Sequence, residues 1–533
     1  MSRACALLPI VLALAACATG APKPAAVAAP AEPAKPAFAL DEASVADLQR
    51  RMSAGELTAH AIMQQYLDRI AAIDKAGPAL NAVIELNPDA LASADALDAE
   101  RAAGKVRGPL HGVPVLLKDN IDTADGMQTS AGSLALVGAA PTQDAAIVAR
   151  LRAAGAVILG KTNLSEWANF RSTGSTSGWS ARGGQTKNPY VLDRNPCGSS
   201  SGSGAAIAAN LAAVAVGTET DGSIVCPAGV NGLVGIKPTV GLVARSGIVP
   251  ISASQDTAGP MARSVADAAA LLTVLAGADP RDKASWDADK HAADYVRALD
   301  AGALKGARIG VLRKQANFHK EVNAAFERSI ALMRGAGATI VDPVEIPNAD
   351  KLGDAEMTVL QYEFKAGLNA YLATRRGVPV ATLAELIAWN AANADRELPI
   401  FGQELLELSQ KRGTLSDKAY KEAQATIQKY ARKEGLDAVL KKHRLDALIA
   451  PTNNPAWTTD PLNGDHYTGG SSGVAAVTGY PSITVPMGQV RELPVGISFI
   501  GAAWSETTLV RLAYAYEQLS KARRAPRFLP TLP

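Results

Sequence analysis

Hydrophobic residues recur every three or four positions through most of residues 40–100, which is the spacing of amphipathic helices. Beyond that segment, short apolar runs alternate with segments of helical spacing. The runs that predict strands are 112–117, 156–159, 307–312, 339–341, 447–450, 482–485 and 494–500, and the predicted helices include 144–154, 205–213 and 322–333. This alternation is typical of an α/β protein with a large, mostly parallel sheet.

An almost continuous helical pattern occupies residues 354–440 and separates the first α/β block from the later strands. Helical insertions of this kind often form a wall of a substrate pocket. Because the later strands can join the same sheet, the pattern fixes no domain boundary at this point.

The N-terminus carries an apolar run, residues 4–16, that follows the basic Arg3. The run is too short to span a bilayer but has the length of a secretory signal. It ends in Leu14-Ala15-Ala16-Cys17, which resembles the lipobox of bacterial lipoproteins, where the cysteine is acylated. We therefore expect a signal peptide at 1–16, lipidation of Cys17 and contact with the membrane through the lipid alone. The alternative is an ordinary signal peptide with a chance cysteine.

Alanine rather than aspartate follows the lipobox cysteine, at position 18, which indicates an exported protein anchored to the outer membrane and facing the periplasm. Residues 17–38 are rich in proline and alanine, a composition that stays extended and buries no core. They predict a tether, and the globular body is expected to occupy residues 39–533.

Composition excludes several classes of function. Hydrophobic residues make up 48% of the 533 positions and charged residues 20%, as in globular proteins. Lys and Arg number 53 against 51 Asp and Glu, so the net charge is +2 and no basic surplus points to nucleic acid.

The four cysteines are Cys5, Cys17, Cys197 and Cys226, and none has the paired spacing of zinc or thioredoxin-like sites. We accordingly expect no metal and no cofactor. With Cys5 removed and Cys17 acylated, the remaining two can form a disulfide in the periplasm. Each lies in a motif that carries chemistry, however, so two buried thiols are predicted instead.

Residues 155–162 match the phosphate-binding pattern G-x-x-x-x-G-K-[ST]. The four central residues are Ala-Val-Ile-Leu, which favour a buried strand rather than a turning loop whose N–H groups face phosphate. The segment also follows a predicted helix, the reverse of the order that a phosphate site needs. We interpret it as a strand and reject nucleotide binding.

Three segments combine residues suited to catalysis. An apolar strand ends at Lys118, a position that a surface lysine can also take. Residues 196–204 form a serine- and glycine-rich loop that leads directly into an apolar helix, which a flexible linker seldom does. Residues 217–227 form a polar turn after an apolar run, and Ser223 in it has the setting of a hydroxyl flanked by free N–H groups, as acyl transfer requires.

These segments together resemble the amidase signature family. The likeness covers residues 41–525, with the serine- and glycine-rich signature at 196–238 and a later hallmark, Asp-Thr-Ala-Gly-Pro-Met-Ala-Arg, at 256–263. The resemblance implies an α/β fold in which a large mixed, mostly parallel sheet is covered by helices on both faces.

The resemblance also implies a Ser–cis-Ser–Lys triad. Ser223 is the expected nucleophile, Ser199 the bridging serine after a cis peptide bond, and Lys118 the base, which must be neutral to act. The backbone N–H groups expected to hold the oxyanion belong to Thr220, Asp221, Gly222 and Ser223.

Asp221 stands where much of the family has glycine. Three interpretations remain open for its carboxylate: it orients the Lys118 and serine network, it orients the substrate amide, or it hydrogen-bonds the turn. His111 lies near Lys118 in the sequence, and we expect it to serve packing rather than catalysis.

Within the family, the likeness is to enzymes that release ammonia from the C-terminal carboxamide of peptides, so a small-molecule or peptide amide is the expected substrate. A broad-specificity aryl or acyl amide hydrolase is the alternative enzyme. The amidotransferase branch that acts on charged transfer RNA is disfavoured by the export signal and the absence of a basic surplus. A solute-binding lipoprotein is the non-enzymatic alternative, but it has no need of Lys118, Ser199 and Ser223 together.

Overall fold

The computed structural model describes residues 38–533. The predicted signal peptide, the acylation site Cys17 and all but the last residue of the predicted tether lie outside the described residues. The remainder from Glu42 to Pro533 forms one compact unit.

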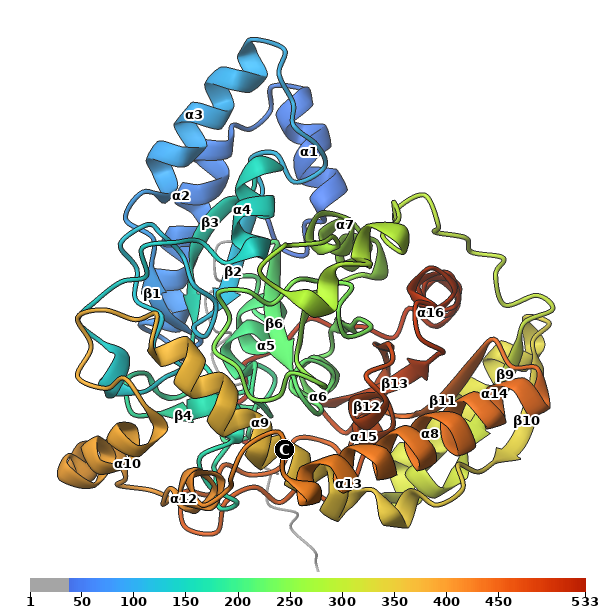
Figure 1. The fold of residues 1–533 in the computed structure, drawn as a ribbon. Helices are drawn as coiled ribbons and strands as arrows, with labels where there is room; N and C mark the ends of the chain where they lie inside the picture. Colours follow the sequence, from blue (N-terminus) through green and yellow to red (C-terminus); the bar gives the residue numbers. More distant parts are fainter. Residues whose placement is uncertain (1–37) are drawn as a thin grey trace, which may run out of the picture. The chain divides into compact units, whose positions relative to one another are not determined.

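A single eleven-stranded sheet runs through this unit, with β1 at one edge and β10 at the other (Figure 1). The order across the sheet is β1-β3-β2-β6-β8-β7-β12-β13-β11-β9-β10. The strands are β1 (Val83–Leu86), β2 (Pro114–Lys118), β3 (Val157–Thr162), β6 (Val214–Glu219), β7 (Val234–Lys237), β8 (Thr257–Ala262), β9 (Arg308–Leu312), β10 (Thr339–Val344), β11 (Ala447–Pro451), β12 (Ser482–Val490) and β13 (Leu493–Ile500). Two short strands, β4 (Trp179–Ser180) and β5 (Gly184–Gln185), pair separately.

The sheet is mixed. Strand β2 pairs in parallel with β3 and β6, and β9 pairs in parallel with β10 and β11. Between these two parallel groups the neighbouring strands from β6 to β11 are antiparallel. The predicted α/β class and large mixed sheet are confirmed, but parallel pairing is confined to the flanks, because the hairpin β12–β13 and the returning strand β8 fill the middle.

Helices cover both faces of the sheet. One group, with α4, α7, α8 and α16, packs together against the strands, and a second group is formed by α5 and α6. The helices are α1 (Val45–Ser53), α2 (Ala59–Arg69), α3 (Ala90–Ala102), α4 (Ala146–Ala153), α5 (Ser201–Ala208), α6 (Val225–Val230), α7 (Val265–Leu275), α8 (Lys320–Gly335), α9 (Gly353–Leu372), α10 (Leu383–Ala392), α11 (Ala394–Glu397), α12 (Glu404–Gln410), α13 (Lys418–Ile427), α14 (Asp437–His443), α15 (Ser472–Thr478) and α16 (Glu506–Ser520).

Short helical segments complete the elements. They are the π-helical η1 (Ile70–Asp74) and η8 (Gln428–Leu436), and the 3-10 segments η2 (Leu134–Leu136), η3 (Glu166–Asn169), η4 (Lys283–Ser285), η5 (Ala288–Lys290), η6 (Arg313–Gln315) and η7 (Ala349–Lys351).

All seven predicted strands are present, while four strands of the sheet, β1, β6, β7 and β8, were not predicted. Strand β1 is a short edge strand inside the segment predicted to be helical. Strands β7 and β8 each contain a glycine, and β8 also contains Pro260, residues that are unfavourable in strands. Glycine is needed in β8 because a Cβ at Gly259 would overlap the carbonyl oxygen of Ile236.

The helical insertion begins with α9 and packs against the body through an apolar cluster. Phe364 and Leu368 of α9 meet Leu136 and Phe170 there, and the rings of Phe170 and Phe364 lie 5.0 Å apart. This packing joins α9 to the segments around η2 and η3. Among residues 38–533, no helix is both long and apolar enough to cross a membrane.

The segment that matches the phosphate-binding pattern is strand β3, as predicted. Lys161 in it is fully buried, and its Nζ donates to the Ile121 carbonyl at 2.6 Å and to Thr129 Oγ1 at 2.8 Å. The ring of His111 is buried and its Nε2 lies 3.0 Å from the Leu97 carbonyl oxygen, the packing role expected for it.

Candidate active site

Lys118 is the last residue of β2, a strand buried along its whole length. Its Nζ donates to Ser199 Oγ at 2.7 Å and to Thr218 Oγ1 at 2.9 Å. Complete burial lowers the pKa of Lys118 to about 7, against the opposing effect of Asp256 and Glu219. A large fraction of this amine is therefore neutral at physiological pH and able to accept a proton.

Ser199 lies in the loop just before α5. The peptide bond between Gly198 and Ser199 is cis, as the family resemblance implied. A side chain at Gly198 would overlap Ser165 Oγ, so only glycine fits there. The sequence prediction of a close backbone approach in this loop, rather than a flexible linker, is consistent with this packing.

Ser223 lies in the turn between β6 and α6, where Gly222 has a φ of +74°. The backbone N–H of Ser200 donates to the Ser223 carbonyl oxygen at 3.1 Å, which joins the two serine-bearing segments. Ser223 is 7% exposed, and its hydroxyl has no hydrogen-bond partner within residues 38–533. The structure thus brings Lys118 and Ser199 into direct contact and leaves the hydroxyl of the adjoining Ser223 available.

Three N–H groups of this turn are also free. Those of Asp221, Gly222 and Ser223 donate to no acceptor in the described part of the chain. The turn is tied to the following helix by Glu219, whose Oε2 accepts from the N–H groups of Ile224 at 2.7 Å and Val225 at 3.0 Å. Free donors held in a fixed turn beside a hydroxyl are the arrangement that stabilises a developing oxyanion.

The contacts of Asp221 bear on the three interpretations of its role. The acidic groups that act on Lys118 are Asp256 and Glu219, and Asp221 is not among them. Asp221 keeps exposed surface and faces α15: its Oδ2 lies 3.7 Å from the position of a Cβ at Gly473. These contacts favour a role toward the substrate or the turn over orientation of Lys118.

Sequence reasoning missed Thr218, a polar partner of Lys118, and Asn120, which bonds Thr218 in turn. Thr218 Oγ1 accepts from Lys118 and also from Asn120 Nδ2 at 3.0 Å. A threonine inside an apolar strand is ordinarily interpreted as packing. Only the parallel pairing of Leu117 with Val216 would have placed Thr218 beside Lys118.

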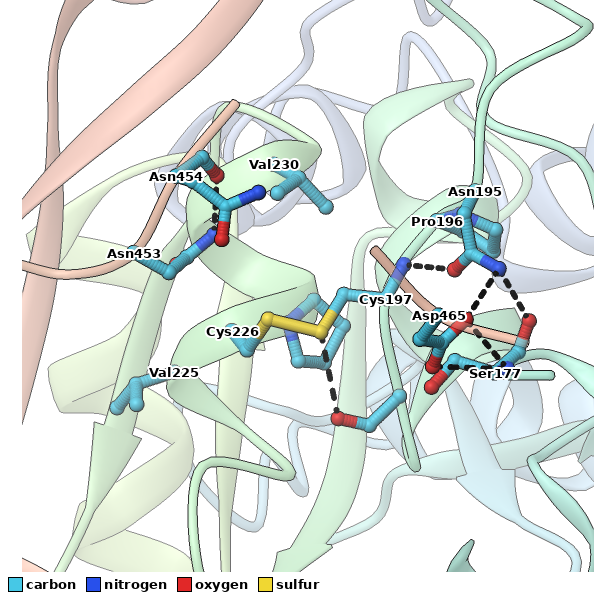
Figure 2. The surroundings of a disulfide bond; sticks show 12 residues. Ser177, Asn195, Pro196, Cys197, Val225, Cys226, Val230, Asn453, Asn454 and Asp465 are labelled. Atoms are coloured by element: carbon cyan, nitrogen blue, oxygen red, sulfur yellow. Dashed lines mark hydrogen bonds between the residues drawn. A yellow bond between two sulfur atoms is a disulfide. The ribbon is translucent and has the colours of Figure 1, made fainter. Parts of the chain in front are cut away.

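The prediction of two free thiols was wrong, because Cys197 and Cys226 form a disulfide (Figure 2). Their Cα atoms lie 6.0 Å apart although 29 positions separate them in the sequence. Both are buried, as expected. The motifs proved compatible with a bridge because the segments that carry Ser199 and Ser223 lie side by side, which the sequence does not specify.

Figure 2 also shows what surrounds the bridge. The backbone N–H of Cys197 donates to Asn195 Oδ1 at 2.8 Å, and Asn195 Nδ2 donates to Asp465 at 3.1 Å. Asp465 accepts in turn from the backbone N–H of Ser177. The disulfide ties the loop before Ser199 to α6, and this network ties the loop to Asp465.

Two cavities adjoin the site. The larger, about 740 Å³, reaches the partners of Lys118 and is lined by Asn120, Thr218, Thr220 and Asp256 among others. The smaller, about 240 Å³, lies on the side of α15. In the part of the chain that the structure describes, no cluster of three His, Cys, Asp or Glu residues has an arrangement suited to a metal ion.

Comparison with known proteins gives consistent matches over nearly the whole body. The sequence profile of the family described as Amidase matches residues 61–510. A probable amidase of Arabidopsis thaliana is 41% identical over 502 residues, which is 92% of this chain and 93% of that protein. A glutamyl-tRNA(Gln) amidotransferase subunit of Symbiobacterium thermophilum is 37% identical, covering 90% of this chain and 98% of that one.

Among solved structures, the chain is similar to the native peptide amidase of Stenotrophomonas maltophilia. The two are 57% identical and superimpose with a TM-score of 0.89, covering 92% of this chain and 100% of the other.

Proposed function

Because the chain belongs to the amidase family, we propose that this amide hydrolase releases ammonia from the C-terminal carboxamide of peptides and leaves internal peptide bonds intact. The observation that carries the choice of substrate is the likeness to the Stenotrophomonas maltophilia peptide amidase, which extends over the whole of that chain.

The proposed mechanism begins with a relay of protons. Neutral Lys118 accepts the proton of the Ser199 hydroxyl, which lies 2.7 Å away, and Ser199 accepts the proton of Ser223. Ser223 Oγ then forms a bond to the carboxamide carbon. The carbonyl π electrons move to oxygen, and the resulting oxyanion is held by the N–H groups of Thr220, Asp221, Gly222 and Ser223.

Collapse of this intermediate breaks the C–N bond. The proton held by Lys118 returns through Ser199 to the departing nitrogen, which leaves as ammonia, and an ester of Ser223 remains. Water then attacks the ester by the same relay, giving the peptide acid and restoring the Ser223 hydroxyl. Burial of Lys118 serves both directions, because a pKa of about 7 lets the amine both accept and return a proton near neutral pH.

Two other functions remain to be separated from this one. A broad-specificity aryl or acyl amide hydrolase would use the same residues with a different pocket. A solute-binding lipoprotein would use none of them. The transfer-RNA amidotransferase branch is less favoured, because the net charge of +2 offers no basic surplus for a nucleic acid partner.

A substrate panel tests the proposal. Purified protein is incubated with N-acetylated peptide amides, the same peptides as free acids, and aryl amides, while ammonia and product masses are measured. We expect ammonia and conversion of amide to acid for the peptide amides alone. Faster turnover of aryl amides would favour the broad-specificity enzyme, and absence of turnover with every amide would favour a binding protein.

We also propose that the protein is exported and held by a lipid on Cys17 at the outer membrane, facing the periplasm. The apolar run at 4–16, the lipobox-like Leu14-Ala15-Ala16-Cys17 and the tether that follows support this location.

In a bacterium with two membranes, the full-length protein is expected in the outer membrane fraction. The Cys17→Ser variant is expected to lose its lipid and leave that fraction, whereas the Cys5→Ser control stays. Fractionation and mass analysis of the N-terminal peptide measure this. An unmodified Cys17 in the mature protein would refute the anchor.

A further inference from the structure

The cavity of about 240 Å³ on the α15 side has walls of aliphatic residues and a single ionisable group, Glu356 of α9. Its aliphatic wall residues include Ile346, Ala349, Leu352, Ala431, Val474 and Val477. This is the composition of a site for a side chain rather than for a polar cofactor.

The cavity adjoins the turn that carries Ser223 along two routes. On one side, Gly473 lines the cavity and faces Asp221, while Ser472 Oγ lies 3.1 Å from the position of a Cβ at Gly222. On the other side, Gln255 Nε2 donates to Glu356 Oε1 at 2.9 Å and to the Thr220 carbonyl oxygen at 3.4 Å. The wall of this cavity is thus connected to the Ser223 turn through Gly473 on one side and through Glu356 and Gln255 on the other.

One polar group here has no hydrogen-bond partner, and one carboxyl has no cationic partner. Gln255 is 1% exposed, yet its Oε1 has no hydrogen-bond partner in the described residues. Glu356 has Asp221 as its charged neighbour, and no lysine or arginine within residues 38–533 forms an ion pair with it. Unpaired acceptors of this kind attract a donor or a cation and repel an anion.

We propose that this cavity receives the side chain of the residue that carries the carboxamide, and that Glu356 and Asp221 make it select uncharged and cationic side chains over acidic ones. The inference rests on the proposed peptide amidase function. It adds a specificity site and a charge preference to that function.

The protonation of Glu356 modulates this preference. Burial, together with the negative charge of Asp221, raises the pKa of Glu356 to about 8. The other groups that face this pair are Gln255, which bonds Glu356, and Lys237 and Tyr467, which lie toward Asp221. Below pH 8 the carboxyl of Glu356 is mostly protonated, and above it the site carries one more negative charge. Rejection of acidic side chains therefore strengthens as pH rises through about 8.

The test compares two N-acetylated dipeptide amides that differ only in ending with glutamine amide or glutamate amide. Wild-type protein should show kcat/KM at least tenfold higher for the glutamine substrate at pH 7, and a larger ratio at pH 9. The same catalytic groups hydrolyse both substrates, so the effect of Lys118 titration on kcat/KM cancels in the ratio. In Glu356→Gln the ratio at pH 7 should stay near the wild-type value, because Glu356 is mostly protonated there, but the ratio should no longer rise between pH 7 and pH 9.

Asp354→Asn is the matched control, since Asp354 is an exposed acid on the same helix that does not line the cavity. Its ratio should equal that of the wild type. In Ala349→Trp, which fills the cavity from an exposed position, activity should fall for large terminal side chains relative to alanine amide.

The outcomes separate the two proposals. Turnover of the glutamine substrate with a ratio near one, or a rise of the ratio with pH that survives Glu356→Gln, would overturn the subsite. If the enzyme rejected a negative charge only on the residue before the C-terminal one, the assignment of the cavity to the C-terminal side chain would also be overturned. No ammonia from any peptide amide would overturn the proposed function itself.

Discussion

Ser223→Ala is expected to lower kcat for ammonia release from a peptide amide by roughly 10⁴-fold or more, the scale seen when a serine hydrolase loses its nucleophile. The variant removes the only group in the proposed mechanism that bonds to substrate carbon. It should fold normally, because the Ser223 hydroxyl has no hydrogen-bond partner to lose among the described residues. Steady-state ammonia assays and a denaturation midpoint measure the two effects.

Ser203→Ala provides the matched control. Ser203 belongs to the same serine-rich segment, and its Oγ lies 2.7 Å from Thr162 Oγ1 in the core. Loss of this bond should reduce the free energy of unfolding by about 1 kcal/mol and leave turnover nearly intact. The two variants are therefore expected to give opposite results. Ser223→Ala should lose activity and keep its stability, whereas Ser203→Ala should lose some stability and keep its activity. Substantial turnover by Ser223→Ala would refute the nucleophile assignment.

The pattern of the sequence predicted the buried strands that contain an unbroken apolar run. Strands β2 and β3 are of this kind, because each is buried along its whole length and opens with an apolar run, 114–117 in β2 and 157–159 in β3. Strand β8 escaped prediction because Gly259 and Pro260 interrupt the run, and Gly259 is required only by the close approach of Ile236 in neighbouring β7. The order of the strands in the sheet was not predicted for a related reason, because strand pairing depends on contacts between segments far apart in the chain.

The candidate site likewise contains residues that the sequence identifies and residues that only the fold identifies. Motifs identified Lys118, Ser199 and Ser223 because each stands in a local pattern of unusual composition. Thr218 and Asn120 were not recognisable, since Thr218 contacts Lys118 only through the pairing of β6 with β2, and Asn120 enters the site through its bond to Thr218. The bridge between Cys197 and Cys226 was misjudged for the same reason, as a distance of 6.0 Å between Cα atoms has no trace in either motif.

Lys118→Met is expected to reduce kcat/KM nearly as much as the loss of Ser223, by roughly 10³- to 10⁴-fold, because no other group takes the proton from Ser199. Methionine retains most of the buried volume, so the effect reports the amine rather than a cavity. In the wild type, kcat/KM should rise with pH through about 7 and fall tenfold per unit below it, since only neutral Lys118 accepts the proton. The measurement is a pH profile of ammonia release.

A second buried lysine serves as the control that distinguishes a catalytic amine from an amine that is merely buried. Lys161 is also fully buried, and burial also lowers its pKa, but its Nζ donates to Ile121 O and Thr129 Oγ1 and contacts neither serine. Lys161→Met should therefore cost about 1–3 kcal/mol of stability by removing the donor to Thr129 Oγ1 and one of the two donors to the Ile121 carbonyl, while turnover and its pH profile remain. If both lysine variants lost activity equally, or if the wild-type profile were flat around pH 7, Lys118 would be a structural amine and the relay through Ser199 would have to be abandoned.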